Sequence, residues 1–342
     1  MVTNVLDLEL RPFTFEAKLM NQESMNNVEK IKIGLSACLA GKNVRYNGGH
    51  TQSALCLKVL APYFEYLTFC PEAEAGFGIP RPAMRLSGDP DNPSLTLSSG
   101  ESDDMKAQLM SGISANLNRF DDIDGYILMK NSPSCGLERI KVYQANGHPH
   151  EKKVSGLFTQ SIKQQYPLLP LEEDGRLHDP KLRENFILRV YTHFQFRKQI
   201  VHAPTLNKLF QFHSQYKYIL MAHNQDLVRE MGRMLADGNK NQISQLTQSY
   251  FEQLMSCLKK PASHKNQTNA LLHLLGYLKK EIPAASRQHI AEVIHQYRNG
   301  LVPLVAPMTL LKHYAQQSEN EYFKFQQYWQ PYPEDLKLIN QI

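Results

Sequence analysis

The chain has 342 residues and a net charge of +5, with 42% hydrophobic and 21% charged residues. This balance is typical of folded globular proteins and excludes a disordered chain. No apolar run approaches the ~20 residues needed to cross a bilayer, and the N-terminus lacks an apolar signal core, so we expect a cytoplasmic protein. Because one hydrophobic core rarely grows beyond roughly 250–300 residues, the length predicts two domains.

The charge is divided unevenly along the chain. Residues 1–190 carry 21 Lys and Arg against 23 Asp and Glu, a net −2, and residues 191–342 carry the other 17 against 10, a net +7. A near-neutral part followed by a basic part indicates chemistry in the first and a polyanion-binding surface in the second. An ordinary solvated helical surface has the same charge pattern.

Strands and helices alternate in the first part of the chain. Residues 1–30 are polar and weakly patterned, and we interpret them as an N-terminal extension. Buried-strand patterns at 31–35, 66–69 and 125–129 alternate with helical patterns at 52–64 and 102–119. This order predicts an α/β domain over 31–198 with an open, mostly parallel, Rossmann-like sheet.

The second part of the chain shows only helical patterns. Pro180 is well placed at the start of a helix that closes the first domain, and residues 199–204 are the predicted linker. Residues 205–342 form a predicted all-α basic domain. Its helices are expected at 205–237, 242–259, 265–281, 284–298 and from about 307 onward.

Three of the five cysteines follow predicted strands. Cys38, Cys70 and Cys135 each lie a few residues beyond a strand end, where open α/β sheets bind their ligands. Cys56, in the middle of a predicted helix, and Cys257, in the basic part, are interpreted as buried thiols. There is no C-x2-C pair, so a zinc ribbon is not predicted.

Three thiolates are able to hold three irons of a [4Fe–4S] cluster and to leave the fourth iron open to a substrate atom. From spacing alone, a structural zinc, a redox thiol pair and three inert thiols stay open as alternatives.

The loops around these cysteines carry a family resemblance. The segments SACLAGKNVRYNGG, FCPEAEAGFGIPRP and KNSPSCG resemble, in order and spacing, the signature of TudS-type thiouracil desulfidases. The resemblance implies an α/β domain whose three cysteines bind a [4Fe–4S] cluster and which removes sulfur from thiolated uracils without net redox change. The segment LNKLFQFHSQYKYILMAHNQDLVREMGRMLAD resembles the helical domain of RudS-type fusions, which act on 4-thiouridine in transfer RNA.

The resemblance also assigns roles within the first domain. It implies that Cys38, Cys70 and Cys135 are the cluster ligands and that Glu72 and Ser132 are catalytic. Glu72 suits a general base or proton shuttle, and Ser132 suits a hydrogen bond to the ring or to the tetrahedral intermediate. The residues alone leave Glu74 as a rival base and Glu72 as a helix cap.

Four further residues of these loops are candidates for substrate binding. A hydroxyl or a base-stacking ring beside the cysteines suits a thiolated nucleotide, although such residues also occur in ordinary turns and solvated loops. The candidates are Ser36, Arg45, Tyr46 and Ser134.

The basic domain favours transfer RNA containing 4-thiouridine as the partner, because phosphate neutralisation supplies most sequence-independent affinity. Candidate phosphate-binding residues are Lys208, Lys217, Arg229 and Arg233. The aromatics of this part suit RNA in composition, but their helical spacing is more typical of a core. They are Tyr216, Tyr218, Tyr297, Tyr322, Phe323 and Trp329. The alternatives are a desulfidase of free thiouracil or 4-thiouridine monophosphate, and a non-enzymatic iron–sulfur redox sensor with a binding domain.

Overall fold

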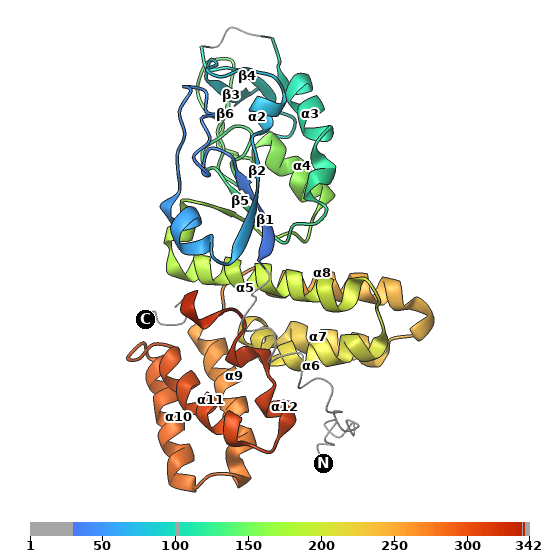
Figure 1. The fold of residues 1–342 in the computed structure, drawn as a ribbon, viewed down its shortest axis with the longest axis vertical. Helices are drawn as coiled ribbons and strands as arrows, with labels where there is room; N and C mark the ends of the chain where they lie inside the picture. Colours follow the sequence, from blue (N-terminus) through green and yellow to red (C-terminus); the bar gives the residue numbers. More distant parts are fainter. Residues whose placement is uncertain (1–29, 100–102, 337, 339–342) are drawn as a thin grey trace.

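The computed structural model describes residues 30–99, 103–336 and 338. Figure 1 shows an α/β part and a helical part that meet at one long helix, α5 (Pro180–Phe196). The predicted extension at 1–30 lies outside the described residues apart from Lys30. Within these residues, no helix combines the length and apolar character needed to cross a membrane.

The main sheet is parallel and has the strand order β2-β1-β5-β7. The bounds are Ile31–Ser36 for β1, Phe64–Phe69 for β2, Tyr126–Leu128 for β5 and Leu171–Glu173 for β7. The first three strands lie where the sequence predicts them, and the α/β fold class is confirmed. Because all four strands run the same way, the loops after β1, β2 and β5 meet at one edge of the sheet.

Short helices connect these strands. The helix expected at 52–64 forms only a π-helical turn, η2 (Leu55–Leu60), and the one expected at 102–119 forms α3 (Lys106–Ser114) and the 3-10 helix η3 (Leu117–Phe120). The other short elements are α2 (Pro71–Glu74), α4 (Leu157–Gln165) and η4 (Arg176–His178).

A second, smaller sheet was not predicted. It has the order β4-β3-β6, with bounds Met84–Ser87 for β3, Ser94–Leu97 for β4 and Val142–Tyr143 for β6. β3 pairs antiparallel with β4 and parallel with β6. In Figure 1 it lies at the far end of the α/β part from α5.

Helix α5 starts at Pro180, as predicted, because Asp179 caps it. The Asp179 carboxylate accepts hydrogen bonds from the backbone N–H groups of Lys181 (2.9 Å) and Leu182 (3.1 Å). The chain then continues into a π-helical turn, η5 (Arg197–Val201). The predicted linker at 199–204 therefore begins inside this turn.

The second part is helical throughout its described residues. The single helix expected at 205–237 is wrong, because Asn224 adopts an extended conformation and caps a new helix with its side chain. The helices are α6 (Leu206–His223), α7 (Gln225–Ala236), η6 (Lys240–Gln242), α8 (Ile243–Cys257), α9 (His264–Tyr277), η7 (Leu278–Lys280), α10 (Ala284–Arg298), α11 (Val305–Gln317), α12 (Glu321–Lys324), η8 (Gln327–Trp329) and η9 (Glu334–Leu336).

An aromatic column joins the two parts. Phe196 at the end of α5 stacks on Phe251 of α8, with ring centres 4.5 Å apart, and meets Phe212 of α6 edge-on at 5.1 Å. One hydrophobic core runs from β1 through α5 into the helical part. α5 therefore packs against both parts of the molecule.

Candidate active site

The three predicted ligands gather at the carboxyl edge of the main sheet. Cys38 follows β1, Cys70 lies between β2 and α2, and Cys135 lies in the loop after β5. Burial raises the pKa of the Cys38 thiol to about 11, and negative charge on Cys70 adds to the rise. The pKa of Cys135 is raised well above its usual value by burial first and then by charge on Cys70, on Glu72 and on Cys38. These mutual effects indicate that the three sulfurs lie close together.

The Cys135 loop is fixed by short polar contacts. The Ser132 oxygen accepts hydrogen bonds from the backbone N–H of Ser134 (3.2 Å) and of Cys135 (3.0 Å). Thr159 on α4 donates its hydroxyl to the Cys135 carbonyl at 2.7 Å. At Gly156 a Cβ atom would lie 2.4 Å from the Ser134 carbonyl oxygen, so only glycine lets α4 begin this close to the loop.

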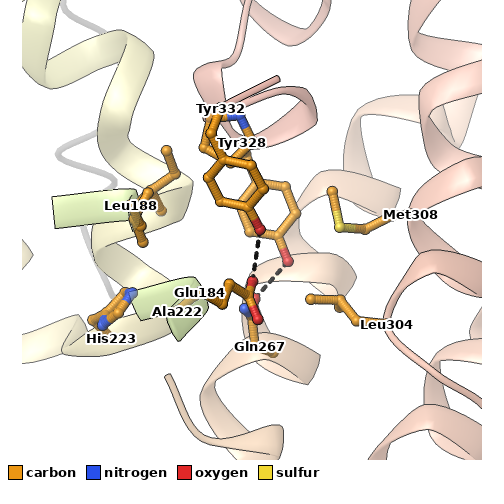
Figure 2. Close-up of a pocket in the computed structure, with 11 residues that line it drawn as sticks. Glu184, Leu188, Ala222, His223, Gln267, Leu304, Met308, Tyr328 and Tyr332 are labelled. Atoms are coloured by element: carbon orange, nitrogen blue, oxygen red, sulfur yellow. Dashed lines mark hydrogen bonds between the residues drawn. The ribbon is translucent and has the colours of Figure 1, made fainter. Parts of the chain in front are cut away.

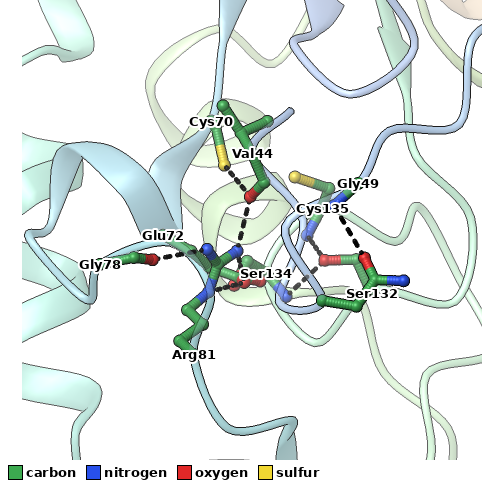
Figure 3. A network of polar contacts seen from close by, with 10 residues as sticks. Val44, Gly49, Cys70, Glu72, Gly78, Arg81, Ser132, Ser134 and Cys135 are labelled. Carbon is green, nitrogen blue, oxygen red and sulfur yellow. Dashed lines mark hydrogen bonds and ion pairs between the residues drawn. The ribbon is translucent and has the colours of Figure 1, made fainter. Parts of the chain in front are cut away.

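Glu72 lies in a closed polar network beside the cysteines (Figure 3). Its Oε2 accepts from Arg81 Nε (3.0 Å) and Nη2 (2.5 Å), and its Oε1 accepts the Ser134 hydroxyl at 2.8 Å. Arg81 also donates to the carbonyls of Gly78 and Val44, both at 3.0 Å. One guanidinium therefore orients the carboxylate and ties together the loops after β1 and β2.

Arg81 was missed by the sequence analysis. It lies in the segment FCPEAEAGFGIPRP, nine residues after Glu72, and its place in that segment was the available signal. Its side chain is 4% exposed, and that of Glu72 is 13% exposed. A charged pair this deeply buried is held by its geometry and its hydrogen bonds.

The rival carboxylate Glu74 points elsewhere. It pairs with Arg119 at 3.8 Å, and both side chains are about two-fifths exposed (42% and 40%). The structure thus places Glu72, and not Glu74, in the network that reaches the cysteines.

Two of the predicted substrate-binding serines contact the site from within the protein. The buried Ser36 oxygen accepts from the Met129 backbone N–H at 3.0 Å, and the Ser36 side chain opposes the rise in the pKa of Cys135. Ser134 is fully buried and donates its hydroxyl to Glu72. The structure therefore turns both hydroxyls toward groups of the site.

Arg45 and Tyr46 lie in the loop after β1. The Arg45 guanidinium donates to the Thr51 hydroxyl and lies 5.8 Å from the centre of the Tyr46 ring. Positive charge on Arg45 opposes the rise in the pKa of Cys38. Tyr46 is 44% exposed, so its ring is available for stacking with a base.

The donor set fits an iron–sulfur cluster. Cysteine thiolates are the usual protein ligands of iron–sulfur clusters. The buried hydroxyl of Tyr126, whose pKa is raised by burial and then by charge on all three cysteines, has no hydrogen-bond partner in the described structure. A cluster sulfur would offer this hydroxyl an acceptor.

The predicted RNA-binding residues lie on α6 and α7. Arg229 and Arg233 are exposed one turn apart on α7, whose buried side chains are Val228, Met231 and Leu235. Arg229 forms an exposed ion pair with Asp226 at 3.1 Å.

The two predicted lysines on α6 are less open than the α7 arginines. Lys208 donates to the carbonyl of Ala203 at 2.9 Å. Lys217 is half-buried, and burial lowers its pKa. The aromatics considered for RNA are mostly core residues. Those that are buried are Tyr216, Tyr218, Tyr297, Phe323 and Trp329.

Comparison with known proteins gives two family matches. Residues 33–174 match the 2-thiouracil desulfurase family, and residues 217–333 match a family described as a protein of unknown function, DUF1722. The uncharacterized protein YbbK of Bacillus subtilis (strain 168) is 34% identical over 128 residues, which are 36% of this chain and 82% of YbbK. The uncharacterized protein YbgA of Escherichia coli (strain K12) is 29% identical over 156 residues, which are 45% of this chain and 92% of YbgA.

One solved structure is also similar. It is described as the [4Fe-4S]-dependent thiouracil desulfidase TudS and is 25% identical, with a TM-score of 0.35. The match covers 46% of this chain and all of that chain.

Proposed function

We propose, because this chain belongs to the 2-thiouracil desulfurase family, that it replaces the sulfur of 4-thiouridine in transfer RNA by oxygen and releases hydrosulfide. The observation that carries the proposal is the gathering of three cysteines and an anchored carboxylate at one edge of the sheet. The three cysteines come from three different loops, and Glu72 follows Cys70 in one of them, so the fold itself assembles the site.

Cys38, Cys70 and Cys135 would hold a [4Fe–4S] cluster through three of its irons. When bound, the cluster supplies an iron with an open position and a preference for soft sulfur donors. Burial raises the pKa of all three thiols, so a bound metal would stabilise their ionised forms.

The side chains of this site suit the proton transfers of the reaction. Hydrolysis adds water to the thiocarbonyl carbon, breaks the carbon–sulfur bond and leaves a carbonyl, so thiocarbonyl and water become carbonyl and hydrogen sulfide. Glu72 accepts the proton of the attacking water and returns one to the departing sulfur. Arg81 fixes the direction of that carboxylate. The Ser132 oxygen already accepts two backbone N–H groups, so its own proton is free to bond the developing oxyanion.

The helical part supports a transfer RNA substrate. Residues 191–342 have a net charge of +7, and exposed Arg229 and Arg233 form a basic pair on α7. A free thionucleotide needs no such surface, because its single phosphate is contacted near the catalytic groups.

The first test follows sulfur removal directly. Anaerobic, cluster-loaded protein is mixed with transfer RNA containing 4-thiouridine, and the near-ultraviolet thiocarbonyl absorption and the released hydrosulfide are measured. We expect both to change with turnover. Glu72→Gln should keep iron and sulfide but lose turnover, and Glu74→Gln is the matched control that stays active. Full iron and sulfide content with no loss of absorption would favour a redox sensor.

The second test separates the two substrates. The double variant Arg229→Gln/Arg233→Gln should raise the KM for transfer RNA and leave turnover of 4-thiouridine monophosphate unchanged. Equal kinetics of the wild type and the double variant on both substrates would instead support a desulfidase of free nucleotides.

A further inference from the structure

A second site lies away from the cysteines, where α5 meets α9 and α10. It is a cavity of about 240 Å³, and a smaller cavity of about 30 Å³ shares several of its walls. Leu188 of α5 and Leu304 before α11 form apolar walls, and Tyr297 of α10 forms an aromatic one. Glu184 and Leu188 lie between the two family matches, which end at residue 174 and begin at residue 217.

Glu184 is the carboxylate that lines both cavities, and Figure 2 shows it in the smaller one. Its Oε1 accepts the Tyr332 hydroxyl at 2.8 Å, and within the described residues Oε2 has no recorded hydrogen-bond partner. Lys181 also lines the larger cavity but is exposed, and no ion pair joins it to Glu184. Burial raises the pKa of Glu184. The Glu184 carboxylate is therefore mostly buried and, in the part of the chain that the structure describes, has one oxygen without a hydrogen-bond partner and has no counter-ion, which is unfavourable for a buried charge.

The donors around this carboxylate are already used. Tyr332 donates to Glu184, and Tyr328 donates to the Gln267 side-chain oxygen at 2.6 Å, as the dashed lines in Figure 2 show. No tyrosine hydroxyl proton of this pair is left for a ligand. These two tyrosines therefore have nothing further to offer an anion or a hydrogen-bond acceptor.

Other residues that line the larger cavity have hydrogen-bond acceptors without a partner among the described residues. His223 Nδ1 lies 2.7 Å from the Lys260 carbonyl and donates to it, and burial lowers the pKa of this histidine to about 4, so its neutral ring keeps a lone pair on Nε2. Asn185 donates its amide to the Leu258 carbonyl at 3.0 Å, which leaves its own oxygen free. Carboxylate, imidazole and amide thus present three acceptors and one negative charge.

We propose that this cavity binds a small organic cation through an ammonium group. The three N–H donors of an ammonium equal the three acceptors in number, and Leu188 and Leu304 offer apolar walls to an alkyl chain. The Tyr297 ring adds a favourable surface for a cation. Magnesium and calcium are bound through oxygen ligands, whereas one of the three acceptors here is an imidazole nitrogen. A bound cation would bridge α5, which carries Glu184 and Asn185, to the end of α6 at His223.

The test uses putrescine, a diamine with a four-carbon chain, on the full-length protein at constant ionic strength. Isothermal titration should show saturable binding, and putrescine should raise the midpoint of heat unfolding. Glu184→Gln, which preserves the shape and an acceptor for Tyr332, should weaken binding about tenfold or more, because a charge-assisted hydrogen bond is lost. The uncharged analogue 1,4-butanediol should not bind.

The controls decide between this site and the protein surface. Glu292→Gln removes the same charge from the exposed face of α10 and should leave the affinity unchanged. The absence of saturable binding, or equal weakening by Glu184→Gln and Glu292→Gln, would overturn the proposal. Competition by MgCl₂ that exceeds the effect of NaCl at equal ionic strength would also overturn it, since it would identify an inorganic cation site.

Discussion

Replacing Arg81 by Met removes the donor that holds the Glu72 carboxylate, the proposed base. In the native protein Arg81 makes two hydrogen bonds to Glu72 Oε2 and one each to the carbonyls of Gly78 and Val44. Methionine keeps much of the apolar stem but leaves the carboxylate with the Ser134 hydroxyl alone. The Val44 carbonyl lies 3.9 Å from the Cys70 sulfur, so the loop after β1 also loses support beside a proposed cluster ligand.

The magnitude follows from the burial of the pair. Breaking a buried ion pair on one side costs about 3–5 kcal/mol, and the 13% exposure of Glu72 lowers the expected loss of unfolding free energy to about 2–4 kcal/mol. A displaced carboxylate should also lower kcat by about 10²-fold, because displacement of a catalytic group by about 1 Å has effects of this size. Arg81→Lys keeps the positive charge but not the planar guanidinium, so we expect its losses of unfolding free energy and of kcat to lie between those of the wild type and of Arg81→Met.

The assay combines urea unfolding with steady-state turnover of the cluster-loaded protein. Glu74→Gln is the matched control, because its exposed pair with Arg119 should contribute less than about 1 kcal/mol. In the double variant Arg81→Met/Glu72→Gln no unpaired charge is left, so its loss of stability should be smaller than the sum of the two single losses. Additive losses, or an Arg81→Met variant with wild-type stability and kcat, would refute the reasoning.

The remaining predictions concern the cluster, its loop and the helical part. Cys135→Ala should abolish bound iron and sulfide, whereas Cys56→Ala and Cys257→Ala should keep both, as measured by metal and sulfide assays. Gly156→Ala should displace the Cys135 loop, because its Cβ would lie 2.4 Å from the Ser134 carbonyl oxygen, and should reduce cluster content. Its control, Gly276→Ala in α9, has nothing within 4 Å and should stabilise slightly. Burial lowers the pKa of both His213 and His223 to about 4. Between about pH 6.5 and pH 4 the unfolded chain therefore binds more protons than the folded protein. As the pH falls through this range, each histidine should lower the free energy of unfolding by up to about 1.4 kcal/mol per pH unit. His213→Gln/His223→Gln should flatten this slope in urea titrations, and an unchanged slope would contradict the assignment.

Local patterns were sufficient for the main sheet but not for the smaller one. The strands at 31–35, 66–69 and 125–129 are recognisable because they are short apolar runs with turn residues after them. β6 has only two residues, and β3 pairs with it across more than fifty residues of sequence. Such pairings depend on tertiary contacts that no local pattern carries. The break at Asn224 was missed because the apolar spacing continues through it while the side chain caps α7.

The site was predictable where chemistry follows directly after a strand. Cys38, Cys70 and Cys135 could be grouped because parallel strands bring their carboxyl ends to one edge. Arg81 follows no strand or helix of its own, and its partners come from two other loops, so only the fold reveals it. Ser132 and Ser134 both flank Pro133, and the sequence alone does not distinguish them. The structure does, because Ser132 accepts backbone N–H groups while Ser134 donates to Glu72.

Because the rings of Phe196 and Phe251 stack on each other, the chain cannot be cut between its two parts without exposing apolar surface. A cut after residue 200 would leave one of these rings on each fragment and would expose apolar surface that the intact chain hides. Each fragment would then tend to associate with itself or with its former partner. Heat should consequently melt the two parts in a single transition, and a recombination that supplies a new C-terminal half must also supply a ring that fits against Phe196.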